Sequence, residues 1–176
     1  MNSNNLKCGA SLMVAFFVCA GLAQATDISG TISSTMTIFD SSRLVGDVTC
    51  TVSGGPCIAI RNYTGWFGTS VTLDLNGFTM TGLGDSQTGC NGAAIGGEVG
   101  ILVSAQSGVI IKGPGLVQRF RNMGISLTAS TGVTVTGVTL STNCASGIFV
   151  VGGTANELTG NVSVRNGNLG NPCGGI

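Results

Sequence analysis

Apolar and polar residues alternate along much of this chain, and the alternating stretches return at a nearly fixed interval. One phrase begins with Gly-Ile and starts at Gly100, Gly124, Gly147 and Gly175, at intervals of 24, 23 and 28 residues. A second phrase ends in glycine and keeps step with the first, at 109–113, 133–137 and 156–160. Self-similarity at intervals of about 20 to 50 residues is the signature of solenoids and other repeat arrays. The pattern therefore predicts stacked repeats built of short strands.

Position within a phrase predicts which side chains face the core, because alternate residues of a strand point to opposite faces. In the first such strand, Val71, Leu73 and Leu75 share one face. Equivalent positions give a predicted inward set of Leu73, Leu75, Val109, Ile111, Val133, Val135, Asn156, Leu158, Ile101, Val103, Ile125, Leu127, Ile148 and Val150. The predicted outward set is Asp74, Asn76, Ile110, Lys112, Thr134, Thr136, Glu157 and Thr159.

The last repeat departs from the others. Asn156 replaces an inward valine, and Val162 and Val164 are shifted by one position from Val138 and Leu140 of the preceding repeat. A shift of one residue turns every later side chain to the opposite face of a strand. We therefore expect a bulge or a corner in this repeat.

Each repeat holds two or three strands joined by turns rich in Gly, Asn, Ser and Thr, and no helix is predicted. Leucine-rich repeats have a similar period, but their Leu-x-x-Leu-x-Leu ladder is absent, and propeller blades need about 40 residues. Coils of strands stacked at about 4.8 Å account for the period. The expected fold is all-β, a right-handed parallel β-helix of about four to five coils with an N-terminal cap, the handedness following from chain chirality.

The chain divides into three expected parts. Residues 1–25 combine Lys7, an apolar run and an Ala-Gln-Ala site, the pattern of a signal peptide cleaved after Ala25; the run is too short for a membrane anchor. Residues 26–57 are poorly periodic and are expected to form short strands and the cap, and 58–176 the β-helix repeats. We therefore expect a secreted or periplasmic protein that is not held in a membrane after cleavage.

Charge excludes some partners. Seven Lys and Arg balance seven Asp and Glu, so loss of Lys7 with the signal leaves six against seven and a net charge of −1. Charged residues make up only 8% of the chain. A protein with so few basic residues has no electrostatic means of attracting nucleic acid or an anionic membrane.

Cysteine usage predicts disulfides, because an exported chain folds under oxidising conditions. Five of the seven cysteines would remain after cleavage, an odd number. Cys50 and Cys57 enclose a turn-rich loop that could close a small ring, and Cys144 and Cys173 occupy related positions before a Gly-Ile phrase. The chain has no His and no Cys-x-x-Cys, so we expect neither a metal site nor a cofactor.

A surplus of about 12 residues over the repeat length lies at 84–97, and insertions in repeat proteins are loops that often form the binding face. Around this insertion stand Asp85, Asn91 and Glu98, which we take as candidate binding residues. Asp74 is a lone outward acid, expected near Lys112 on the adjacent coil.

Phe120 is expected to point inward, which would place Arg119 and Arg121 together on the outer face. Two guanidinium groups could bind the carboxylates of an acidic polysaccharide, although a solvated face explains the pair more simply. Tyr63 and Trp66 could stack on a sugar, but we expect them to fill the cap end of the fold.

The segment VTLDLNGF at 71–78, the repeated GI phrases, GVTVTGVTL and LTGNVSVRN resemble right-handed parallel β-helix proteins of the pectate-lyase-like superfamily. Over about 58–176 the chain is most similar to repeat-only modules of exported bacterial proteins and of a periplasmic copper-enzyme maturation factor. The resemblance implies the fold, whereas the clustered acids that serve the lyases and polygalacturonases of the superfamily are missing. Asp85 and Glu98, 13 residues apart, form no such motif.

Together these features favour an exported, non-catalytic β-helix module that binds carbohydrate or a cell-surface protein through its outer face. The alternatives are a polysaccharide lyase or hydrolase, or a fragment of one, and an adhesin or surface structural protein. Gly175 and Ile176 begin a coil that is not completed, and an uncapped coil exposes unpaired strand edges. We therefore expect either that the chain is a fragment or that another chain covers its end, by end-to-end pairing for instance.

Overall fold

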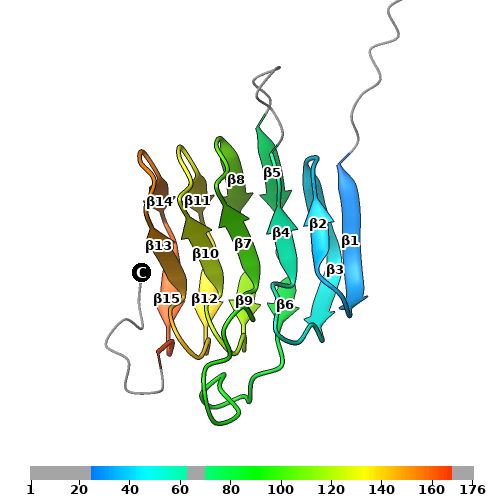
Figure 1. Ribbon diagram of the computed structural model, residues 1–176. Helices are drawn as coiled ribbons and strands as arrows, with labels where there is room; N and C mark the ends of the chain where they lie inside the picture. Colours follow the sequence, from blue (N-terminus) through cyan, green and yellow to red (C-terminus); the bar gives the residue numbers. More distant parts are fainter. Residues whose placement is uncertain (1–24, 63–69, 168–176) are drawn as a thin grey trace, which may run out of the picture.

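The computed structural model describes residues 25–62 and 70–167, and all regular secondary structure within these ranges is β-strand (Figure 1). The strands are β1 (Thr26–Ile32), β2 (Met36–Ile38), β3 (Ser42–Cys50), β4 (Ile58–Ile60), β5 (Val71–Asp74), β6 (Thr79–Thr81), β7 (Ile101–Ser104), β8 (Val109–Lys112), β9 (Leu116–Gln118), β10 (Ile125–Thr128), β11 (Thr134–Thr136), β12 (Thr139–Ser141), β13 (Ile148–Val151), β14 (Glu157–Thr159) and β15 (Val162–Val164). No helix that could cross a membrane occurs in the described ranges. Residues 1–24 of the predicted signal peptide, Tyr63, Trp66 and Cys173 lie outside them.

All strand pairs are parallel, and the strands form two sheets. The larger sheet has the order β14-β11-β8-β5-β3-β6-β9-β12-β15, with β1 paired to β3, and the smaller has the order β13-β10-β7-β4-β2. The larger sheet is continuous because the nine residues of β3 pair with β5 at Ser42 and with β6 at Val48. The predicted all-β, helix-free architecture is confirmed for the described residues.

Successive passages of the chain stack one strand on the last in three columns, as Figure 1 shows. We call each passage a coil; the coils are β2–β3, β4–β6, β7–β9, β10–β12 and β13–β15. Residues 26–57 form β1, β2 and β3, which begin both sheets. The repeat period seen in the sequence is therefore the length of one coil.

One hydrophobic core runs between the two sheets. Eleven of the predicted inward residues are at most 3% exposed: Leu73, Leu75, Val109, Ile111, Val133, Val135, Ile101, Val103, Ile125, Leu127 and Ile148. Phe120 is 3% exposed, so its predicted inward position is also confirmed. Burying each large aliphatic side chain stabilises the fold by roughly 1.5 to 3 kcal/mol, and stacking supplies that burial because a single coil encloses no core.

The last coil differs from the prediction in two ways. Val150 lies in register with the buried Leu127, yet it is 41% exposed because no described strand stacks on β13. The expected bulge is wrong: β15 pairs with β12 without a register shift, with Val162 opposite Thr139 and Ser163 opposite Leu140. The strand keeps its register and the residue types change instead, so that valines face outward and serine inward.

Asparagines bind the coils to one another with a repeated pair of hydrogen bonds. In each case Oδ1 accepts from a backbone N–H 23 residues earlier and Nδ2 donates to a carbonyl 26 residues earlier. The four residues that do so are Asn143, Asn156, Asn161 and Asn166. Asn156, predicted to point inward, thus satisfies the backbone of the coil before it.

Candidate functional site

The loop between β6 and β7 is the long irregular segment of the described chain, and it extends below the sheets in Figure 1. This loop contains the predicted insertion at 84–97. The disulfide between Cys90 and Cys144 fastens it to the turn that follows β12. Gly89 has φ of +73° and lies so close to the carbonyl of Thr142 that a Cβ there would be 1.9 Å from the oxygen. Only glycine allows this approach, so the loop lies directly against the turn after β12.

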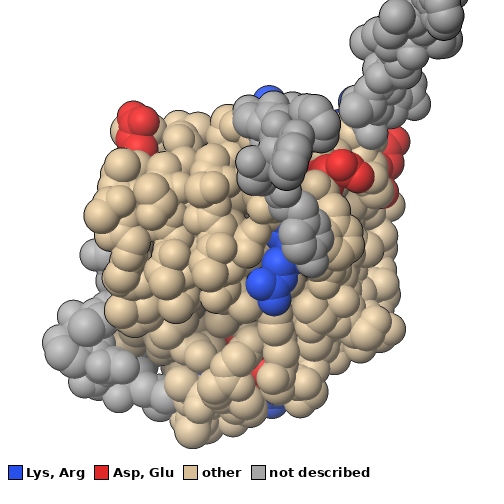
Figure 2. Space-filling model, turned by 45° about the horizontal axis from the view of Figure 1, so that its top comes forward, with Lys and Arg blue, Asp and Glu red and all other residues tan. Residues whose placement is uncertain are grey.

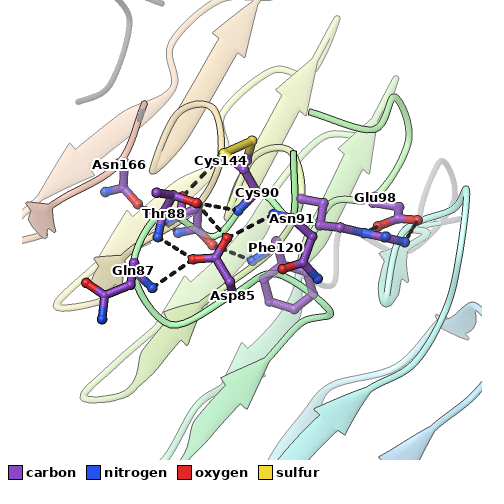
Figure 3. Close-up of a disulfide and its surroundings, with 11 residues drawn as sticks. Asp85, Gln87, Thr88, Cys90, Asn91, Glu98, Phe120, Cys144 and Asn166 are labelled. Atoms are coloured by element: carbon purple, nitrogen blue, oxygen red, sulfur yellow. Dashed lines mark hydrogen bonds and ion pairs between the residues drawn. A yellow bond between two sulfur atoms is a disulfide. The ribbon is translucent and has the colours of Figure 1, made fainter. Parts of the chain in front are cut away.

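Asp85 organises the tip of this loop, as Figure 3 shows. Its carboxylate accepts hydrogen bonds from the backbone N–H groups of Gln87, Thr88 and Asn91 at 2.6–3.0 Å and from the Thr88 hydroxyl at 2.7 Å. The Thr88 hydroxyl and these backbone N–H groups hold the pKa of Asp85 well below its usual range. The carboxylate is ionised and is used to shape the loop.

Glu98 stands at the other end of the loop in a buried ion pair. Its side chain is 3% exposed, and its carboxylate accepts from Nε and Nη2 of Arg121 at 2.5 and 2.6 Å. The N–H of Gly54 and the hydroxyl of Ser53 complete the site at 2.9 and 3.2 Å. Burial raises the pKa of Glu98, but the bonds from Arg121, Gly54 and Ser53 outweigh it and the pKa lies below its ordinary value. The pair connects three distant segments: the turn before β4, the loop and the turn after β9.

The other candidate residues are also engaged. Asp74 accepts from Nζ of Lys112 at 2.9 Å, which confirms the expected pairing, and from the N–H of Asn76 at 2.9 Å. Asn91 donates from Nδ2 to the carbonyl of Leu83. Arg119 is partly exposed and has φ of +57°, and it binds the loop through its carbonyl oxygen. The two arginines do not act together, because Arg121 is turned toward Glu98.

The cysteines form two disulfides in the described residues. Cys50 pairs with Cys57, closing the small ring that their spacing suggested. Cys144 pairs with Cys90, 54 residues away in sequence. The repeat pattern does not predict this pairing, because Cys90 lies in the insertion and has no repeat position. Two disulfides fit a protein that folds in an oxidising environment.

The acidic residues proposed as candidates therefore form contacts that stabilise the fold. Asp74, Asp85 and Glu98 each accept bonds from side-chain and backbone donors of the protein itself. General acid–base catalysis on a sugar needs two carboxyl groups that face one substrate. Across 25–62 and 70–167, no three His, Cys, Asp or Glu side chains gather to hold a metal ion either. The three carboxylates are therefore engaged by groups of the protein itself.

The outer face of the five-stranded sheet is a second candidate, and sequence reasoning missed it. Its middle row runs in register through Ala59, Leu102, Ser126 and Phe149. The last three of these residues each follow the Ile of a Gly-Ile phrase. A parallel row contains Ser104, Thr128 and Val151. We call these seven residues the five-stranded face. None of the seven is charged, whereas the exposed Arg61 directly follows β4, and Figure 2 shows a wide tan area with blue Lys or Arg atoms near the middle of the view.

The middle row combines apolar and hydroxyl groups. Leu102 and Phe149 are half-buried, and Ser126 between them is only 5% exposed, with its hydroxyl 3.4 Å from that of Thr128. An aromatic ring and an aliphatic side chain thus stand on either side of a hydroxyl pair. The signal in the sequence was the alternation itself: it predicts Leu102 and Phe149 outward, where apolar residues are not needed for the core.

Comparisons of this chain with protein-family models, with curated proteins and with solved structures gave no match. Its function is therefore argued from the chemistry of its own surfaces.

Proposed function

We propose that this chain is an exported, non-catalytic module with a right-handed parallel β-helix fold of the pectate-lyase-like type, and that it binds a neutral polysaccharide through the five-stranded face. The three strand columns, all parallel, support this fold assignment, and chain chirality favours the right-handed sense. The two disulfides support export.

One observation carries the binding proposal: the uncharged row in which Ser126 lies between Leu102 and Phe149. A sugar ring has an apolar C–H face and a rim of hydroxyls. The ring of Phe149 offers a stacking surface for the first. The hydroxyl of Thr128, 3.4 Å from that of the buried Ser126, can donate to and accept from the second. Strand spacing of about 4.8 Å presents these groups at regular intervals along a rigid surface, which suits a polymer better than a single small molecule.

The seven residues of the face carry no charge, and the exposed Arg61 that follows β4 lies only at the edge of the face. This composition favours a neutral glycan. Uronate polymers are recognised by Arg or Lys, and Arg121 is already paired with Glu98. Binding of a neutral polymer requires no such group. The carboxylates of Asp74, Asp85 and Glu98 are held by internal donors, so the proposal includes no hydrolysis or elimination.

Retention on insoluble glycans tests the proposal when combined with an assay for sugar release. We expect retention on a neutral polymer such as cellulose, chitin or a β-glucan, little on a pectate gel, and no release of reducing or unsaturated sugars. Retention on the uronate gel alone would contradict the neutral-glycan assignment. Sugar release that is lost in Asp74→Asn, Asp85→Asn or Glu98→Gln would establish an enzyme instead.

A further inference from the structure

Three Asn-Gly pairs occur in the chain, at 76–77, 91–92 and 166–167, and all three lie within the described ranges. Such a pair can deamidate without an enzyme. The backbone nitrogen of the glycine loses its proton to water and attacks Cγ of the asparagine, ammonia leaves, and a cyclic imide forms. One water molecule then opens the imide to aspartate or isoaspartate, so that a neutral amide becomes a carboxylate. Glycine hinders the attack least because it has no Cβ. The three pairs thus share one chemistry and differ in their surroundings.

The pair at 76–77 is held against neighbouring coils. The N–H of Gly77 donates to the carbonyl of Pro114 at 2.6 Å, and Nδ2 of Asn76 donates to the carbonyl of Leu44 in β3 at 3.0 Å. The attacking nitrogen and the leaving amide are therefore both bound to other segments of the stack. The reaction at Asn76 requires these bonds to open first.

The pair at 166–167 is held in the same manner. The N–H of Gly167 donates to the carbonyl of Asn143 at 3.1 Å. Asn166 is only partly exposed, and its Oδ1 accepts from the N–H of Asn143 while its Nδ2 donates to the carbonyl of Leu140. Deamidation at this pair would break several hydrogen bonds that join the last coil to the one before it.

The pair at 91–92 lies in the loop between β6 and β7, and both of its residues are exposed. Within the described parts of the chain, the N–H of Gly92 donates no hydrogen bond, and neither do those of Ala93 and Ala94. A Cβ placed on Gly92 would have no atom within 4 Å, so the space around it is open. A segment with so few contacts can change its backbone conformation without opening the stack of coils.

Asn91 makes its own hydrogen bonds within the same loop. Its N–H donates to Oδ2 of Asp85 at 3.0 Å, and its Nδ2 donates to the carbonyl of Leu83 at 2.7 Å. Neither bond involves Cγ of Asn91 or the nitrogen of Gly92, the two atoms that must meet. Because both acceptors belong to the loop, only the loop has to move for the attack.

We propose that Asn91 is a site of spontaneous deamidation, and that the carboxylate formed there loosens the loop as the protein ages. The product can no longer donate to the carbonyl of Leu83, and its charge stands in the same turn as the ionised carboxylate of Asp85. The lost donor and the repulsion between like charges both weaken the loop. The disulfide between Cys90 and Cys144 keeps the loop attached, so the change is local.

Peptide mapping of the full chain during incubation at mildly alkaline pH tests the site, because mass spectrometry detects the exchange of NH for O at each Asn-Gly pair. In guanidinium chloride the three pairs should react at similar rates. In the folded protein Asn91 should keep most of its denatured rate, whereas Asn76 and Asn166 should react at least about tenfold more slowly, since their hydrogen bonds must open first. Equal rates at the three sites of the folded protein, or a rate at Asn91 as low as that at Asn166, would overturn the proposal.

Limited proteolysis tests the effect of the new charge on the loop. Asn91→Asp should be cleaved within 84–97 about fivefold faster than the wild type, because cleavage follows the population of the open loop. Asn91→Gln is the matched control, since it keeps a neutral amide and should be cleaved as slowly as freshly prepared wild type. Circular dichroism and the unfolding midpoint show whether each variant is folded. Equal cleavage of Asn91→Asp and the wild type, or equally fast cleavage of Asn91→Gln, would overturn the effect of the charge.

Discussion

Glu98 shows how an acidic residue that looks available in the sequence is used inside the fold. Its carboxylate accepts four hydrogen bonds, two of them from Arg121, and it is almost fully buried. Removal of one member of such a pair leaves the other charge buried without a partner, which is costly. Glu98 therefore holds the loop against two coils.

Glu98→Gln should lower the free energy of unfolding at pH 7 by about 2 kcal/mol, because neutral hydrogen bonds replace charged ones. Asp40→Asn, at an exposed acid, is the control and should change little. Chemical denaturation measures both. Equal stability of Glu98→Gln and the wild type at pH 7 would contradict the structural role of the ion pair.

The pH dependence follows from the direction of the same shift. The folded pKa of Glu98 is depressed, so its stabilisation is present above the unfolded pKa of about 4.3 and is lost as the pH falls through the folded pKa. The wild type should therefore lose stability below about pH 4.3 more steeply than Glu98→Gln. Denaturation midpoints between neutral and acid pH show the slopes, and parallel curves would refute the assignment. Asp85, whose pKa is also depressed, adds to the slope in both proteins.

The positions of the candidate residues were predictable, but only some of their partners were. The insertion identified Asp85 and Glu98 as residues of interest, and the outward position of Asp74 gave its pairing with Lys112. Arg121 and Ser53 could not be predicted as partners of Glu98, since the insertion has no repeat register from which a contact follows. Long-range contacts of an irregular loop depend on the completed stack of coils.

At the scale of elements, the asparagines link one coil to the next. Asn143 is fully buried and satisfies the N–H of Phe120 and the carbonyl of Val117. Asn161 makes the equivalent bonds from the last coil but is partly exposed. The same pair of hydrogen bonds is thus buried at Asn143 and partly exposed to solvent at Asn161.

Asn143→Ala should cost roughly 2 to 3 kcal/mol of unfolding free energy, because two backbone groups lose their partners away from water. Asn161→Ala should cost less, since solvent can replace its bonds. Urea unfolding of both variants compares them directly. A larger loss for Asn161→Ala would mean that the last coil is more tightly packed than the coils before it.

The disulfides give a second prediction at this scale. Peptide mapping of the unreduced protein should recover Cys50 linked to Cys57 and Cys90 linked to Cys144. Reduction should expose the loop at 84–97 to proteolysis first, because it would then be held mainly by its glycine contacts and by Glu98. A peptide that joins Cys144 to Cys173 would contradict the placement of the loop.

The last strand shows where pattern analysis fails. An apolar residue was assumed to point inward, so the shift of Val162 and Val164 was interpreted as a bulge or a corner. Pairing to β12 kept the strand in register, and the ladder of backbone hydrogen bonds determined the facing. The polarity of a residue predicts which face of a strand it occupies only where another strand stacks on that strand. None of the described strands stacks on β15 beyond β12.

For the molecule as a whole, the repeat period was enough to predict parallel strands, stacked coils and most of the core. The five-stranded face was not predicted, because apolar residues of a repeat were interpreted mainly as core residues. No role was assigned to the apolar residues that face outward. Leu102 and Phe149 face outward in register with buried Ser126, an arrangement that core packing does not require. Surplus outward apolar groups on an uncharged sheet are the basis of the proposed glycan site.

The most direct test of that site is the binding isotherm of a soluble oligomer of the retained neutral glycan, measured for the wild type, Phe149→Ala and Val45→Ala. Loss of the stacking ring should weaken binding about tenfold, corresponding to about 1.4 kcal/mol, whereas the change at the exposed valine of β3 should leave the affinity unaltered. Equal affinities of all three proteins, or no measurable binding by the wild type, would contradict the account.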